Sequence, residues 1–224
     1  MTVIPREVSD QVVGTADQAY VLGLWCADSY WWSSSIGISN VEPELVVRFA
    51  AYLRGLLDPE RLRIRVYEVK GDPPDTRVLA LTTKISIRPA GKARRTAYHA
   101  YVNSRALVRR FQAQKARLEE VIPEAFIGPY FAGRFDGDGS WGSRPRVAYT
   151  TREEAEVDAR MLARAKVHRT SVLTYRDAGT VCVYIHRSEL DRFRHLIEPW
   201  SWKMVVHPVE TAMASLAGGT PPNL

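Results

Sequence analysis

The chain has 224 residues, of which 46% are hydrophobic and 25% charged, and its 31 Lys and Arg exceed its 25 Asp and Glu to give a formal net charge of +6. This composition permits a hydrophobic core without disulfides or a structural metal, and the length suits one large domain or two small ones. The positive excess is compatible with a polyanionic partner.

Cys26 and Cys182 are the two cysteines, and neither lies in a C-x-x-C or Cys/His cluster. We therefore expect buried thiols in a reducing compartment and no zinc site. Residues 1–10 lack the apolar segment of a secretion signal, and no apolar run reaches membrane-spanning length. These features predict a soluble, cytoplasmic protein with no membrane partner.

The first half of the chain predicts helices alternating with strands. The pattern of residues 17–32 begins as a nearly all-apolar, buried helix, which is expected to end at Asp28 and Ser29. Alternation predicts a strand at 33–40, and helical spacing predicts a helix at 42–57. Further strands are expected at 61–69, 77–88 and 97–103, with a hairpin loop at 71–75 and a helix at 104–121.

The same order of elements then starts again. Residues 127–135 predict a second apolar helix, followed by a strand at 141–150, a helix at 152–165, strands at 167–176 and 181–186, and a helix at 188–197 with Ser188 as its N-cap. We interpret the chain as an internal duplication, with repeat one at 15–118 and repeat two at 119–212. The Gly/Pro-rich tail, 213–224, is expected to be disordered.

The two apolar helices end in related nine-residue segments, VLGLWCADS at 21–29 and FAGRFDGDG at 131–139. Each segment has two small residues four positions apart, namely Gly23 and Ala27 in the first and Gly133 and Gly137 in the second. Small residues at this spacing let two helix backbones approach closely. The spacing therefore predicts that the two helices pack against each other.

Each segment also carries an acid at its eighth position, Asp28 or Asp138. If the helices pack in parallel, the two carboxylates lie side by side at the negative ends of two helix dipoles. Two adjacent carboxylates are not comfortably ionised without a cation, and hard divalent ions such as Mg²⁺ prefer oxygen ligands.

Both segments resemble the nine-residue motif that names the LAGLIDADG homing endonucleases. The second is a close match, whereas the first departs at Cys26, where the family often has an acid, and at Ser29, where it usually has Gly. The resemblance covers about residues 15–210. It implies an α+β fold, in which two pseudo-symmetric αββαββα repeats form a saddle of antiparallel sheets that straddles DNA.

The resemblance implies that Asp28 and Asp138 are catalytic, metal-binding carboxylates, and backbone carbonyls near Ala27 and Gly137 are expected to add ligands. The family also places a basic residue near each active site. Lys203 fits this position in repeat two, and Lys115 is our assignment in repeat one. The alternatives for either lysine are a phosphate contact or a plain surface position.

Strand alternation places basic and polar residues opposite the apolar faces. The predicted DNA-binding residues are Arg61, Arg63, Arg65, Thr82, Lys84, Ser86 and Arg88 in repeat one, and Arg144, Arg146 and Arg176 in repeat two. Like charges on one sheet face repel unless a polyanion is near, and a twisted β-ribbon fits the major groove of DNA. For any single residue, a solvated sheet face is the alternative.

The predicted function is hydrolysis of phosphodiester bonds at a long, asymmetric site in double-stranded DNA by a monomer that needs no protein partner. Mg²⁺ or Mn²⁺ is the expected cofactor, and Ca²⁺ is expected to bind without supporting cleavage. Alternatives are a catalytically silent DNA-binding regulator with the same fold and an RNA maturase that assists intron splicing. Cys26 and Ser29 also leave open that one strand is cut more slowly than the other.

Overall fold

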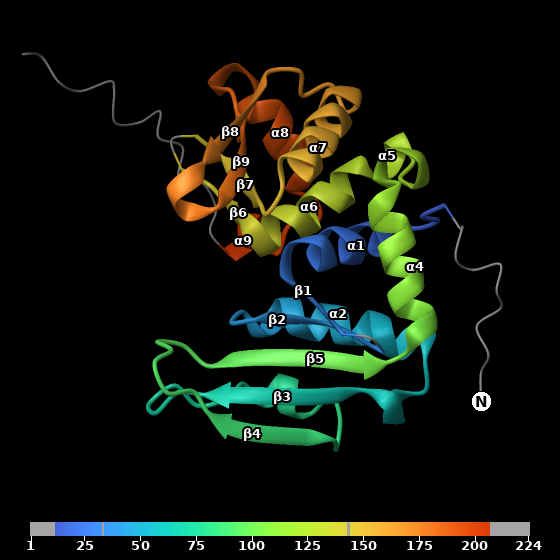
Figure 1. Ribbon diagram of the computed structural model, residues 1–224, viewed down its shortest axis with the longest axis vertical. Coiled ribbons are helices and arrows are strands. Elements are labelled where there is room, and N and C mark those ends of the chain that lie inside the picture. Colours follow the sequence, from blue (N-terminus) through green and yellow to red (C-terminus); the bar gives the residue numbers. More distant parts are fainter. Residues whose placement is uncertain (1–11, 33, 143, 207–224) are drawn as a thin grey trace, which may run out of the picture.

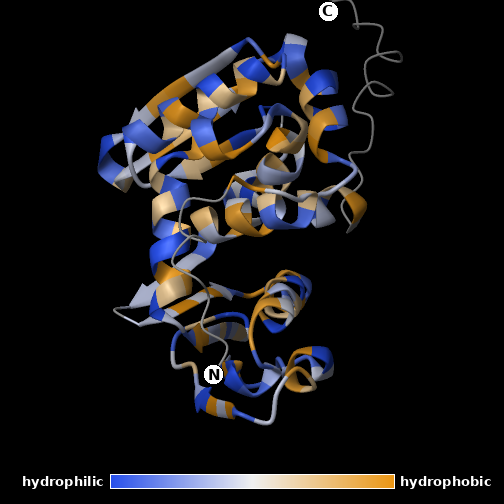
Figure 2. Cartoon of the chain, turned by 90° about the vertical axis from the view of Figure 1, so that its right-hand side faces the viewer, coloured by the Kyte–Doolittle hydropathy of each residue, from blue (hydrophilic) through white to orange (hydrophobic). Residues whose placement is uncertain are grey.

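The computed structural model describes residues 12–32, 34–142 and 144–206. The sequence-based expectations for residues 1–10 and for the tail at 213–224 lie outside these ranges. Two helices, α1 (Ala16–Asp28) and α6 (Ile127–Asp138), lie between two β-sheets in the middle of the molecule (Figure 1). Viewed from the side in Figure 2, the two halves lie one above the other, with hydrophobic and hydrophilic residues interspersed along their helices and strands.

Repeat one begins with α1 and carries a five-stranded sheet in the order β1-β2-β5-β3-β4. Its further elements are β1 (Ser29–Trp32), β2 (Ser35–Asn40), α2 (Pro43–Leu56), β3 (Arg63–Glu68), α3 (Thr76–Leu79), β4 (Ile85–Pro89), β5 (Ala97–Asn103), α4 (Arg105–Ala116) and α5 (Leu118–Val121). All neighbouring strands are antiparallel except β3 and β4, which are parallel.

Repeat two begins with α6 and carries a four-stranded antiparallel sheet in the order β6-β7-β9-β8. Its further elements are β6 (Gly139–Ser140), β7 (Arg146–Tyr149), α7 (Arg152–Arg164), β8 (Thr170–Tyr175), β9 (Thr180–Ile185), α8 (Leu190–Ile197) and α9 (Trp202–Val206). From α6 to α8 this is the predicted αββαββα order. Repeat one follows the same plan with α3 and β4 added between β3 and β5.

The predicted single strand at 77–88 and the hairpin loop at 71–75 are wrong. Asp75 caps α3, because its Oδ1 accepts a hydrogen bond of 2.8 Å from the backbone N–H of Arg77, and Val78 is fully buried. The chain therefore forms a helical turn at 76–79 and then returns parallel to β3 as β4. The alternating leucines of this segment also suit a short helix followed by a loop. Their alternation therefore led to the wrong prediction of a strand.

The first apolar helix ends at Asp28, as expected, and the backbone becomes extended at Ser29, where the edge strand β1 begins. One smaller expectation fails. Ser188 is not the N-cap of α8, which begins at Leu190. Instead, the ring Nδ1 of His186 accepts from the backbone N–H of Ser188 at 3.3 Å and starts a short 3₁₀ turn.

Other expectations are confirmed. Cys26 and Cys182 are buried free thiols, and burial raises the pKa of Cys26 to about 11. Within residues 12–206, apart from 33 and 143, none of the helices has the length and apolar character needed to cross a membrane. The sheets bury one face each, with Ile36, Ile38, Ile64, Val66, Val147 and Val183 in the core.

Candidate functional site

The site is built on the contact between α1 and α6. A Cβ atom on Gly23 would lie 2.0 Å from the carbonyl oxygen of Tyr130, and one on Gly133 would lie 2.0 Å from the carbonyl oxygen of Tyr20. No side chain fits at these distances, so the two helices meet backbone to backbone. The close helix contact predicted from the spacing of small residues is therefore confirmed.

The C-terminal ends of the same helices also meet. A Cβ on Gly137 would lie 2.3 Å from Cβ of Ala27 and 2.9 Å from Oδ2 of Asp28. The carboxylate of Asp28, at the end of α1, is thereby held against the last turn of α6, which ends at Asp138. The fold thus brings together the two segments that carry the predicted acids.

The carboxylate of Asp28 is in an environment that disfavours its ionised form. Burial is the main cause that raises its pKa to about 6, and the charge of Asp138 adds to the shift. The Nδ2 of Asn40 opposes it by donating a hydrogen bond of 2.7 Å to Oδ2 of Asp28. A carboxylate destabilised in this way gains from any bound cation.

Asn40 was not identified from the sequence. It is the last residue of β2, and its Oδ1 accepts a hydrogen bond of 2.7 Å from the backbone N–H of Glu42. This second bond fixes which side of the amide faces Asp28. The one sequence signal was a polar residue closing an alternating strand, which is too common to indicate a site.

Asp138 shares this environment. Burial raises its pKa and the nearby carboxylate of Glu154 raises it further, whereas Arg134 and Lys203 lower it. The two acids at the helix ends therefore both lie in partly buried surroundings that disfavour their ionised forms. A bound cation would offset this cost.

Lys203 lies at the C-terminal end of α6, where its sequence position suggested it. Its ammonium donates to the carbonyl oxygens of Phe135 at 3.1 Å, Gly137 at 3.1 Å and Gly139 at 2.9 Å. Burial lowers its pKa, while Asp136, Asp28 and Asp138 oppose the shift. The lysine thus places a positive charge at the negative end of the helix, beside both predicted catalytic acids.

Asp136, which the sequence reading did not single out, positions this lysine. Its fully buried carboxylate accepts from Tyr20 Oη at 2.6 Å, Ser201 Oγ at 2.5 Å, Trp202 N at 2.8 Å and Lys203 N at 3.1 Å. It therefore caps α9 and ties that helix to α6. In repeat one the corresponding residue is Cys26, which makes no such cap.

Lys115 has a different setting. Its ammonium lies 2.7 Å from Oε1 of Glu154, so α4 of repeat one is bridged to α7 of repeat two. The structure joins Lys115 to this glutamate rather than to either aspartate. Lys115 and Lys203 are therefore not equivalent in their contacts.

The donors around the helix ends are oxygens. A hollow beside them is lined by Asp28, Asn40, Glu42, Gly137 and Lys203, among other residues. In the described part of the chain, no group of three or more His, Cys, Asp and Glu side chains could hold a metal ion. Two carboxylates with backbone and amide oxygens are a donor set for a hard divalent cation, and the predicted ligand carbonyl of Gly137 already accepts one bond from Lys203.

The outward face of the first sheet carries part of the predicted basic surface. Arg63 and Arg65 lie on β3 opposite Tyr101 and His99, and Arg65 pairs with Ser86 while Tyr67 pairs with Arg88 on β4. These residues share the face that points away from Ile64 and Val66. Four predicted residues, Arg63, Arg65, Ser86 and Arg88, are thus brought together.

The other three predicted residues of repeat one are not on strands. Arg61 ends a 3₁₀ turn, and its guanidinium donates to the carbonyl of Asn103. Thr82 Oγ1 donates to the carbonyl of Leu62 at 2.9 Å, and Lys84 donates to the carbonyl of Glu60. Arg61 precedes β3, and the segment before β4 is a loop, in which Thr82 and Lys84 hold the ends of β3 and β4 together.

An aromatic cluster on the same face was not predicted. The ring centroids of Tyr30 and His99 are 3.8 Å apart, and those of His99 and Tyr101 are 4.8 Å apart. Gly37 lies between Tyr30 and Tyr101 in the sheet. Pairing across strands, which a single strand pattern does not reveal, assembles this cluster.

The second sheet is less basic on its outward face. Arg146 lies there and donates to the hydroxyl of Tyr184 at 2.9 Å. Arg144 precedes β7 and is exposed at the border of the sheet, and Arg176 lies in the turn between β8 and β9. The structure thus brings one of the three predicted arginines onto the sheet face itself.

Solved structures with a similar fold include those of two proteins. A mesophilic variant of the homing endonuclease I-DmoI matches with a TM-score of 0.60 at 18% identity, over 86% of this chain and 97% of that one. I-DmoI in complex with DNA and Mn matches with a TM-score of 0.59 at 18% identity, over 81% and 96%. The N-terminal LAGLIDADG domain of DUF199/WhiA matches with a TM-score of 0.54 at 13% identity, over 88% and 95%.

No protein-family model and no curated protein matches the sequence. At these low identities, the structural matches establish the fold, and they agree with the resemblance in the two nine-residue segments. The chain has the homing-endonuclease-like fold of I-DmoI and of the LAGLIDADG domain of WhiA, with two repeats joined through their apolar, acid-ended helices.

Proposed function

We propose that this protein is a divalent-metal-dependent endonuclease that cuts double-stranded DNA at a long asymmetric site. The observation that carries the proposal is the meeting of Asp28 and Asp138 at the ends of two helices that contact each other backbone to backbone. Two sheets flank this centre, and each presents arginine on its outward face. A duplex lying across both sheets would pass the acids at its middle.

The residues present suit a hard cation such as Mg²⁺ or Mn²⁺. Asp28 and Asp138 would hold it, with the carbonyls of Ala27 and Gly137 as further donors. Burial is the main cause of the raised pKa of each acid, and a bound cation would favour the ionised form of both. I-DmoI has been solved with Mn, with Mg and with Ca, which supports a divalent ion of this class.

A cation bound there supplies Lewis-acid stabilisation of the leaving oxygen and an activated water. The chain's own residues orient that chemistry: Asn40 holds one carboxylate oxygen of Asp28, and Lys203 carries positive charge beside the centre. An ammonium at this position stabilises the negative charge that develops on a phosphate under attack. Because each repeat supplies one acid, we expect a single chain to cut both strands.

A second candidate function is DNA binding without cleavage. One observation favours it: Lys203 is fully engaged with three carbonyls and Lys115 with Glu154, so both predicted basic residues have partners within the protein. An RNA maturase would use the same basic surface on structured RNA. These candidates differ in substrate and in product.

The test is incubation of the full chain with a randomised duplex library in Mg²⁺ and, separately, in EDTA. The proposal predicts metal-dependent double-strand breaks with short 3′ overhangs at one sequence. Tight duplex binding in Mg²⁺ without any break identifies a binding protein. Failure to bind duplex, together with binding to structured RNA, identifies the maturase.

A further inference from the structure

The outward faces of the two sheets differ in chemistry. Among the residues that the structure describes, no carboxylate pairs with Arg63, Arg65 or Arg88 on the first sheet. These three arginines lie on adjacent strands of one face. Unpaired arginines grouped in this way lack an anionic or acceptor-rich partner within the protein.

Arg65 is held in place with a donor unused. Its Nη1 lies 3.4 Å from the hydroxyl of Tyr67, and its guanidinium carbon lies 5.8 Å from the ring centroid of Tyr101. Its Nε is buried and has no hydrogen-bond partner in the described part of the protein, so the Nη groups are the donors that can reach a ligand. A guanidinium held in this way suits two acceptors on one edge, as guanine offers with O6 and N7 in the major groove.

The second sheet has an apolar row across three strands. Ala148 on β7 pairs with Cys182 on β9, and Cys182 pairs with Leu173 on β8, so the three side chains lie side by side on the outward face. Cys182 is buried, whereas Leu173, on the edge strand β8, is 46% exposed. An exposed apolar side chain on a binding face is suited to an apolar group on the ligand.

Polar groups border this row. The hydroxyls of Tyr175 and Tyr184 are 2.7 Å apart, and Arg146 donates to Tyr184, so a hydrogen-bonded chain links Arg146 to two tyrosines. A hollow of about 530 Å³ next to the row is lined by Leu173 and Tyr184 together with Arg144 and Arg187, among other residues. Arginines beside an apolar side chain suit backbone phosphates next to the bases that this side chain contacts.

We infer that the two sheets read chemically different halves of one DNA site: repeat one reads guanines through Arg63, Arg65 and Arg88, and repeat two reads the 5-methyl groups of thymines through Leu173. This inference rests on the proposed duplex substrate and goes beyond it by assigning base chemistry to each half. Thymine is the base that presents a methyl group in the major groove. The selected site is therefore asymmetric in composition, with one G-rich and one T-rich half.

The test begins with selection of bound duplexes from a randomised library in Ca²⁺. In the selected duplex, each half is then modified separately, by uracil for thymine, which removes the methyl group, or by 7-deazaguanine for guanine, which removes N7. We expect uracil to weaken binding roughly four-fold per contacted methyl in one half alone. We expect 7-deazaguanine to weaken binding by roughly five-fold or more in the other half alone.

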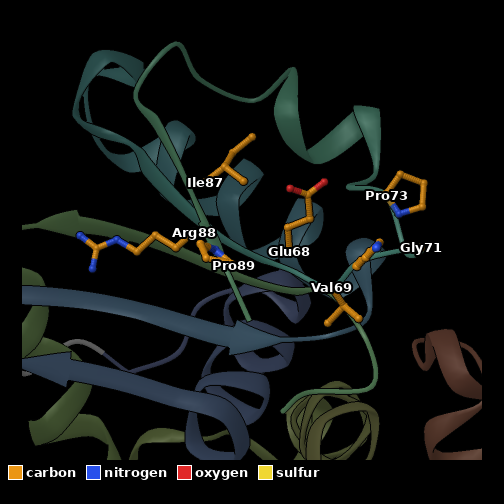
Figure 3. A pocket seen from close by; sticks show the side chains of 8 residues that line it. Glu68, Val69, Gly71, Pro73, Ile87, Arg88 and Pro89 are labelled. Atoms are coloured by element: carbon orange, nitrogen blue, oxygen red, sulfur yellow. The ribbon is translucent and has the colours of Figure 1, made fainter. Parts of the chain in front are cut away.

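Three exposed positions assign the halves to the repeats. Leu173→Ala should abolish the sensitivity to uracil, and Arg63→Ala should reduce the sensitivity to 7-deazaguanine. Ile87→Ala is the matched control, because Ile87 is 53% exposed but points from β4 to a different side than Arg88, as Figure 3 shows. This control should leave both sensitivities unchanged.

The outcomes separate this inference from the proposed function. Metal-dependent cutting with equal sensitivities in both halves supports the proposed endonuclease function but overturns the assignment of guanine and thymine readout to different repeats. Full sensitivity to uracil in Leu173→Ala also overturns it. If no duplex is bound, the substrate class itself is wrong and the inference falls with it.

Discussion

Gly23 and Tyr130 are in backbone contact, so that a Cβ on Gly23 would lie 2.0 Å from the Tyr130 carbonyl oxygen. Replacing Gly23 by Ala forces α1 and α6 apart, because neither backbone can yield locally. We expect the free energy of unfolding to fall by about 3 kcal/mol or more, since overpacking against rigid atoms is costly. Urea unfolding followed by circular dichroism measures this loss.

Gly55→Ala is the matched control for that experiment. Gly55 lies in the last turn of α2, and a Cβ there meets nothing within 4 Å. Alanine favours a helix over glycine by up to about 1 kcal/mol, so this variant should be as stable as the wild type or slightly more stable. Equal stability of Gly23→Ala and wild type would refute the close contact between the helices.

Asn40→Ala should slow the cutting of one strand. The amide of Asn40 holds Oδ2 of Asp28, and Asp138 has no equivalent bond from an asparagine among the contacts of the described residues. Loss of the bond frees the carboxylate and raises its pKa further. A duplex labelled on each strand should therefore accumulate nicked product, with one strand cut roughly ten-fold more slowly, as for loss of a positioning group.

Asn103→Ala is the comparison for Asn40→Ala. The side chain of Asn103 accepts from Ser35 Oγ at 2.8 Å on the same sheet, and it has no contact with Asp28. It should leave the ratio of the two strand-cutting rates unchanged. Equal slowing of both strands by Asn40→Ala would contradict a role for Asn40 at one acid alone.

Asp28→Asn should stabilise the fold at neutral pH in EDTA. The pKa of Asp28 is about 6 in the folded protein against 3.8 for the free group. A raised carboxyl pKa stabilises the folded state below pH 3.8, and this stabilisation is lost as pH rises through 6. At pH 7.5 the ionised carboxylate therefore lowers the free energy of unfolding by at most about 3 kcal/mol. Asparagine, which carries no charge, removes this loss of stability.

The difference between Asp28→Asn and wild type should shrink as pH falls from 6 to 4, which thermal unfolding at several pH values measures. Asp177→Asn, at an exposed turn between β8 and β9, is the control and should change stability by less than about 0.5 kcal/mol throughout. Mg²⁺ should raise the stability of wild type more than that of Asp28→Asn. A stability difference between Asp28→Asn and wild type that does not change with pH would show that burial does not raise the pKa of this carboxylate.

Lys203→Met should destabilise the protein more than Lys115→Met. Lys203 satisfies three carbonyls at the end of α6, and each bond from a charged donor contributes, so we expect a net loss of about 2 kcal/mol. Lys115 forms a single, partly exposed ion pair with Glu154, which is worth about 1 kcal/mol or less. Chemical denaturation of both variants compares their stabilities. The reverse order of stability would contradict the stabilising role of the three hydrogen bonds from Lys203 to the end of α6.

Part of this site was predictable from the sequence because its signals are local. The four-residue spacing of Gly23 and Ala27, and of Gly133 and Gly137, specifies a helix face without any knowledge of the rest of the fold. The acids follow from their position at the helix ends. The repeat in the order of elements then placed the two helices in equivalent positions.

The rest depended on contacts between distant residues. Asp136 acts through Ser201 and Lys203, which lie 65 and 67 positions away, and no pattern near Asp136 indicates such partners. The parallel pairing of β3 and β4 was missed because alternating leucines suit both a strand and the short helix α3 that Asp75 caps. Sheet faces likewise became visible only once the registers were known.

The most direct test of the central claim uses a selected duplex, labelled on both strands, with wild type, Asp28→Asn and Asp138→Asn. The account predicts cleavage of both strands by wild type in Mg²⁺ and none in EDTA. It also predicts that either folded variant retains duplex binding but no longer makes double-strand breaks. Metal-dependent cleavage of both strands at the wild-type rate by Asp28→Asn or Asp138→Asn would contradict the assignment of these two acids as the catalytic centre.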